Sequence, residues 1–166
     1  VDVSSLLSPE RTRQVLAAYA ALLRSGAAET LLPQIDAERA EALAAAAGET
    51  TAKSTAELLE PLGVQVLIGD ARASGLPEGS VDLFVSNNTF EHIAPRVLGE
   101  IVAEFKRLAA PGAVMDHFVD MSDHYAHFDS SITEFNYLRY SDRAWRPFNN
   151  RLQYQSRLRL PDYRRI

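Results

Sequence analysis

The stretch VDLFVSNNTFEHI, residues 81–93, changes character near its midpoint. Residues 81–86 are mostly apolar and include β-branched side chains, which is typical of a buried strand. Asn87 then begins a dense polar cluster, with two amides, a hydroxyl, a carboxylate and an imidazole within six positions. Because side chains capable of chemistry follow the apolar run directly, the stretch predicts a binding or catalytic site where the strand ends.

Similar apolar runs and helical patterns surround this strand. Residues 64–70 (VQVLIGD) and 113–120 (AVMDHFVD) are predicted as two further buried strands. Between residues 95 and 108 the apolar side chains recur at helical spacing, which predicts an amphipathic helix. The alternation of strands and helices predicts an α/β fold with a mostly parallel sheet and helices on its faces.

Ligands of such sheets bind beyond the carboxyl ends of the strands. Asp70, Asn87 and Asp120 each end one of the three predicted strands, so we expect them to line one edge of the sheet. The remaining predicted elements are the end of a strand at 1–3 and helices over 10–24, 34–47, 51–60, 131–140 and 142–146.

The composition of the 166 residues excludes several kinds of site. There is no cysteine, which rules out disulfides, thiolate metal ligands and a cysteine nucleophile. No apolar run has the length that a membrane helix needs, and no signal peptide is recognisable, so a cytoplasmic location is expected. The chain begins inside an apolar stretch and closes on PDYRRI, the pattern of a helix start, so we expect it to be incomplete at both ends.

Three segments together resemble class I S-adenosylmethionine-dependent methyltransferases of type 11: VD (1–2), GDARASGLPEGSVDLFVSNNTFEHI (69–93) and EFKRLAAPGAV (104–114). The resemblance implies a three-layer Rossmann-like sandwich, S-adenosylmethionine as the cofactor, and a small-molecule, sugar or lipid-linked methyl acceptor. It implies one methyltransferase-like domain over residues 1–166, with a helical insertion over roughly 10–60 and an irregular acceptor-side region over roughly 121–166. It leaves the oligomeric state open.

The resemblance also implies roles for individual residues, and the alternative for each is a cap, a turn or a surface side chain. One aspartate would accept hydrogen bonds from the ribose and another from the adenine, and the amides would meet the methionine portion. The residues implied to hold the cofactor are Asp2, Asp70, Ala71, Asn87 and Asn88, and those implied to border the acceptor are Thr89, Glu91 and Asp120.

The chain departs from the family pattern in two places. The G-x-G-x-G loop, which lets the backbone approach the cofactor, is absent, because no two of the eight glycines are spaced as G-x-G. The usual LKPGG turn is replaced by LAAPGA, residues 108–113. Burial of a central strand is worth ~10 kcal/mol, comparable with the whole stability of a domain, so either a further strand lies upstream or the resemblance is misleading. The resemblance also implies two more strands downstream.

Residues 116–129 (DHFVDMSDHYAHFD) contain three of the four histidines and four aspartates, and two interpretations stay open. In the first, His124 or His92 takes a proton from the acceptor and Asp123 orients the imidazole. In the second, a metal binds to Asp120, Asp123, His124 and His127. We favour the first, with no metal, because the spacing matches no recognised ligand motif.

Beyond residue 138 the chain carries eight arginines against Asp142 and Asp162, and aromatic side chains lie between them. Arginines interleaved with aromatic rings are typical of stacking surfaces for nucleic acid. The alternative function is therefore a non-catalytic domain of the same fold that binds nucleic acid or an acidic partner. The acidic remainder of the chain argues against nucleic acid, which leaves methyl transfer as the preferred prediction.

Overall fold

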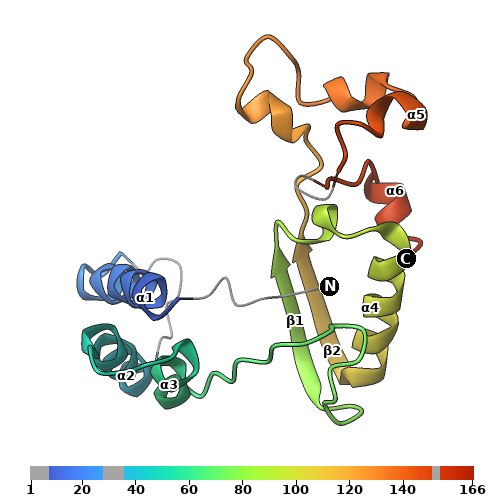
Figure 1. The fold of residues 1–166 in the computed structure, drawn as a ribbon. Coiled ribbons are helices and arrows are strands. Elements are labelled where there is room, and N and C mark those ends of the chain that lie inside the picture. Colours follow the sequence, from blue (N-terminus) through green and yellow to red (C-terminus); the bar gives the residue numbers. More distant parts are fainter. Residues whose placement is uncertain (1–7, 28–35, 151–153) are drawn as a thin grey trace. The chain divides into compact units, whose positions relative to one another are not determined.

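The computed structural model describes residues 8–27, 36–150 and 154–166. These residues form two compact units, which divide between Asp70 and Ala71. Figure 1 draws the elements of both units. The predicted end of a strand at residues 1–3 lies outside the described residues, and the prediction that one domain covers residues 1–166 stays a prediction.

The described part of the first unit is helical. Its elements are α1 (Pro9–Arg24), α2 (Ala37–Gly48), α3 (Thr55–Leu59) and a 3-10 turn, η1 (Glu60–Leu62). Each α-helix starts where a polar side chain accepts a hydrogen bond from a backbone N–H of the first turn, and the three caps are Ser8, Asp36 and Ser54. The three predicted helices are confirmed, the last with a shorter extent.

The predicted strand over residues 64–70 is wrong, because these residues are irregular. Leu67 and Ile68, which a buried strand would cover, are exposed. A strand needs a neighbouring strand to pair its backbone N–H and C=O groups. Among the described residues, 64–70 have no such neighbour, so Asp70 does not end a strand.

A parallel pair of strands organises the second unit. β1 (Val81–Asn87) confirms the predicted strand, and β2 (Ala109–Phe118) begins four residues earlier than predicted. The pairing is regular from Leu83 opposite Val114 to Asn87 opposite Phe118, and an irregularity precedes it. Gly112 lies within that irregularity with a positive φ of 86°, a conformation that glycine adopts without steric cost.

The helix α4 (Pro95–Leu108) connects the two strands and packs along them (Figure 1). It has the predicted bounds, because Pro95 occupies its first turn, where a missing N–H costs nothing. The ring of Phe84 on β1 stacks on that of Phe105 on α4, with their centroids 4.8 Å apart. A parallel strand, a connecting helix and a second parallel strand are the unit of a Rossmann-like α/β fold, so that fold class is confirmed, although the described sheet has only two strands.

The face of β1 and β2 that is turned away from α4 is apolar and exposed within this unit. Its exposed apolar side chains are Leu83, Val85, Val114 and Phe118. Strands of parallel sheets carry such side chains because they are usually covered on both faces.

The chain after β2 folds into short turns beyond the carboxyl ends of the strands (Figure 1). They are η3 (His124–His127), η4 (Asn136–Arg139), α5 (Asp142–Trp145) and α6 (Leu160–Tyr163). Tyr137 holds them together: its ring is fully buried, its hydroxyl donates to the Met121 carbonyl at 2.8 Å, and Arg159 donates to that hydroxyl at 3.0 Å. None of the helices in the described ranges is both long and apolar enough to cross a membrane.

Candidate functional site

The parallel pairing brings the ends of β1 and β2 together. Asn87 lies opposite Phe118, and the Asn88 N–H donates to the Phe118 carbonyl at 3.0 Å. Asp120 follows two residues after β2, so Asn87 and Asp120 lie at the same end of the pair, as predicted. Asn88 has a φ of 49°, and asparagine is one of the few side chains that tolerate this left-handed conformation. Thr89 closes the turn by donating to the Asn87 carbonyl at 3.0 Å.

The turn after β1 buries a carboxylate. Glu91 lies in the 3-10 helix η2 (Phe90–His92), and 1% of its surface is exposed. Neither of its carboxylate oxygens has a hydrogen-bond partner among the described residues. The nearest basic atom that pairs with it is His92 Nε2, at 4.0 Å from Oε1. A buried carboxylate without hydrogen bonds is costly, so this side chain requires a physical explanation.

His92 itself is half exposed and has a defined orientation. Its Nδ1 lies 2.9 Å from the Tyr154 carbonyl oxygen, which can only accept a hydrogen bond. Nδ1 therefore carries the proton of the neutral ring, and Nε2 presents a lone pair on the side of Glu91.

His124, the first residue of η3, faces the same turn from the segment that follows β2. Its ring centroid lies 5.0 Å from that of His92. The Asp120 carboxylate lies 3.5 Å from His124 Nε2 and 3.8 Å from His127 Nε2. Burial lowers the pKa of His124, and this effect outweighs the opposing attraction of Asp120. Burial raises the pKa of Asp120, but hydrogen bonds from Ser122 and the charge interaction with His124 and His127 bring it below the usual value.

The prediction that Asp123 orients a histidine is wrong in its choice of carboxylate. Asp123 is fully buried, and its two oxygens accept hydrogen bonds from the Tyr125 N–H at 3.0 Å and from the Asn136 side chain at 3.3 Å. It is the N-cap of η3. The carboxylate facing the His124 ring is that of Asp120, four residues earlier.

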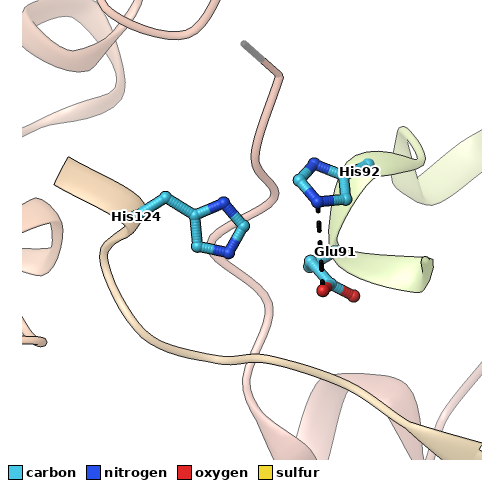
Figure 2. Close-up of side chains that lie close together, drawn as sticks. All are labelled: Glu91, His92 and His124. Carbon is cyan, nitrogen blue, oxygen red and sulfur yellow. Dashed lines mark ion pairs between the residues drawn. The ribbon is translucent and has the colours of Figure 1, made fainter. Parts of the chain in front are cut away.

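Glu91, His92 and His124 form one group. Each offers a ligand atom within 4.8 Å of the other two, and Figure 2 shows His124 approaching the other two from a separate segment. The sequence placed Glu91 beside the acceptor and the histidines in catalysis, but it did not predict that the three meet. The metal alternative named a different set, of which only His124 belongs to this group.

The predicted adenosine-binding positions lie elsewhere in the chain. Asp2 is outside the described residues, Asp70 ends the first unit with a half-buried side chain, and Ala71 begins the second.

A cleft of about 750 Å³ lies between Pro95, at the start of α4, and the C-terminal turns, and none of the described histidines lines it. Trp145, Tyr140 and Tyr154 line it together with Arg146 and Arg157. Tyr154 connects the cleft to His92 through its carbonyl, and Ser156, which also lines it, donates its N–H to the Glu91 carbonyl at 2.6 Å. No sequence signal could have found these partners, because 62 residues separate His92 from Tyr154.

Several C-terminal aromatic side chains contact each other around Trp145. Trp145 is buried, and its ring stacks on those of Tyr140 and Phe148. Arg157 donates to the carbonyls of Tyr137 and Tyr140 and pairs with Asp142. Trp145 and Arg157 are therefore engaged within the unit, whereas Tyr140 and Phe148 remain partly exposed, and the nucleic-acid alternative stays a prediction.

A family model described as a methyltransferase domain matches residues 16–115, which is more than half of the chain and includes β1 and α4. No curated protein and no solved structure matches the chain.

Proposed function

The chain belongs to the class I S-adenosylmethionine-dependent methyltransferases, and we propose from this membership and from the site that it methylates a small molecule. The acceptor class includes sugars and lipid-linked molecules, and a cytoplasmic location is part of the proposal. The observation that carries it is the parallel pair β1 and β2, which delivers Asn87 and the group around His92 and His124 to one end of the sheet.

S-adenosylmethionine is the cofactor of the family, and when bound it supplies a methyl group activated on a sulfonium. The side chains at the end of β1 suit its methionine portion, since Asn87 and Asn88 are exposed amides that can donate to a carboxylate and accept from an ammonium group. Asp70 and Ala71 are proposed to meet the adenine, and Asp2 the ribose.

The acceptor is proposed to occupy the cleft lined by Trp145, Tyr140 and Tyr154. Aromatic walls provide apolar contact area, and Arg146 at the rim suits an acceptor that carries an acidic group. Thr89, Glu91 and Asp120 do not line this cleft, and they are proposed to border the acceptor because they follow β1 and β2 at the same end of the sheet.

The chain's own residues can then position the acceptor and receive its proton. His92 Nε2 has a lone pair, and the Asp120 carboxylate can hold the His124 ring in place. Holding the two reactants in line supplies much of the acceleration of such a displacement.

The test is a calorimetric titration of the full chain with S-adenosylhomocysteine. We expect micromolar binding that Asp70→Ala and Asn87→Ala each weaken by at least about tenfold, because a hydrogen bond to a charged group contributes about 1.5–3 kcal/mol. Asp82→Ala is the matched control, since Asp82 is exposed near the start of β1 and belongs to no part of the site. A folded chain that releases no heat with this ligand would refute the proposal.

A further inference from the structure

We propose that Glu91, His92 and His124 bind a first-row divalent metal ion, with Zn²⁺ as the best-suited member of that class. This assignment goes beyond the proposed methyl transfer and does not depend on it. It differs from the metal set suggested by the sequence, because it takes Glu91 and His92 from the turn after β1.

The spacing of the three side chains is close to that of the ligands in a metal site. The three candidate ligand atoms lie within 4.8 Å of one another. Ligands at about 2.0–2.1 Å from a tetrahedral zinc ion lie about 3.3 Å apart. Side-chain adjustments that draw the atoms together by up to about 1.5 Å therefore complete the coordination.

The second observation is that the Glu91 carboxylate is buried without a hydrogen-bond partner. Its carboxylate is almost fully buried, and both oxygens lack a hydrogen-bond partner in the described chain. Buried charges in proteins are paired or coordinate metals. His92 at 4.0 Å is too distant to hydrogen bond with this carboxylate, whereas a cation between the two would satisfy both.

The third observation is the orientation of His92. A histidine that binds a metal through one nitrogen usually donates its other N–H to a carboxylate or a backbone carbonyl, which sets the tautomer. His92 does this through Nδ1 and the Tyr154 carbonyl at 2.9 Å, which leaves Nε2 as the ligand atom. The Asp120 carboxylate lies 3.5 Å from His124 Nε2, which is an ion-pair distance and does not by itself set the tautomer of that ring.

The donor set defines the class of metal. Two imidazoles and one carboxylate suit zinc, iron or manganese, and they do not suit calcium or magnesium, which prefer oxygen ligands. Three protein ligands leave at least one position open, as in catalytic zinc sites. A hydroxyl or carboxylate of the acceptor could take that position. In this arrangement His92 Nε2 is a ligand and cannot also accept a proton.

The experiment is a titration of the full, metal-free chain with ZnCl₂ by calorimetry, repeated with CoCl₂ while the visible absorption of bound Co²⁺ is recorded. Glu91→Gln, His92→Asn and His124→Asn are compared with His127→Asn. The last is the matched control, because His127 is an exposed histidine near Asp120 that does not belong to the group. Circular dichroism establishes that each variant is folded.

We expect one zinc ion per chain, an affinity reduced by at least about tenfold in each of the three ligand variants, and no change in His127→Asn. We also expect the Co²⁺ spectrum of a site with nitrogen and oxygen ligands, which disappears in the His92→Asn, His124→Asn double variant. Absence of binding by the folded chain overturns the proposal. So does binding that survives in the double variant, or binding that Glu91→Gln leaves unchanged and His127→Asn abolishes. None of these results requires methyltransferase activity, so a failure here is distinct from a failure of S-adenosylhomocysteine binding.

Discussion

Replacing Glu91 by methionine tests whether this buried carboxylate lacks a partner when no metal is present. Methionine has a similar length and no polar atoms, so Glu91→Met removes both unpartnered oxygens while the space remains filled. The backbone contact is kept, because it is the Glu91 carbonyl that accepts from the Ser156 N–H.

The magnitude follows from the cost of an unsatisfied buried group. Such a group costs about 1–3 kcal/mol, and a charged one costs more. In EDTA we therefore expect Glu91→Met to raise the free energy of unfolding by about 1–3 kcal/mol. With zinc at about 100 times the dissociation constant, the unsubstituted chain gains about 2.7 kcal/mol. The variant has lost a ligand and is stabilised less by zinc. With zinc, its free energy of unfolding therefore no longer exceeds that of the unsubstituted chain.

The assay is urea unfolding followed by tryptophan fluorescence. Trp145 is the single tryptophan and is buried in the second unit, so its emission reports on the unit that contains Glu91. Glu78→Met is the control: Glu78 is exposed, and its replacement should change the free energy of unfolding by less than about 0.5 kcal/mol with or without zinc. If Glu91→Met lowers the free energy of unfolding in EDTA by more than about 1 kcal/mol, the carboxylate is satisfied without a metal and the reasoning fails.

Two further predictions concern the packing of the second unit. Hydrogen bonds from Arg107, and to a smaller extent from Ser74, lower the pKa of Glu104 to about 2. The ionised carboxylate therefore stabilises the fold above the ordinary pKa of 4.5, and this contribution is lost as the pH falls from 4.5 towards 2. We expect Glu104→Gln to be less stable than the unsubstituted chain at pH 6 and the difference to shrink towards pH 2 in urea unfolding; a difference that is constant over this range would contradict the assigned pKa. Phe84→Ala should lower the free energy of unfolding by about 3–5 kcal/mol, because the buried ring stacks on Phe105. A loss below about 1 kcal/mol in thermal or urea unfolding would show that α4 does not pack on the sheet through this pair.

Several parts of the fold could be predicted from the sequence because short-range interactions decide them. The helix from Pro95 to Leu108 has its predicted bounds, since a proline in the first turn and an apolar face are both local features. The strand from Val81 to Asn87 is equally local in its pattern, and the parallel arrangement of β1 and β2 follows from the helix between them.

For other parts of the chain, the local sequence pattern was not enough to predict the structure. Residues 64–70 have the composition of a buried strand, but a strand is stabilised by a partner that the segment cannot supply. In the site, the adjacency of Asp123 and His124 suggested that the carboxylate orients the imidazole. Asp123 is instead buried as the N-cap of η3, and Asp120 faces the His124 ring.

The local sequence pattern places polar, titratable side chains after β1 and β2, and parallel pairing then requires them to share one end of the sheet. Which of these side chains meet depends on long-range packing. Glu91 and His92 have ligand atoms within 4.8 Å of one on a histidine more than 30 residues away, and His92 is oriented by a carbonyl 62 residues away. These contacts depend on how the turns after β2 fold back over the strand ends, and burial of Tyr137 and Trp145 holds those turns in place. No spacing along the chain encodes that packing, because it is a balance of many long-range contacts.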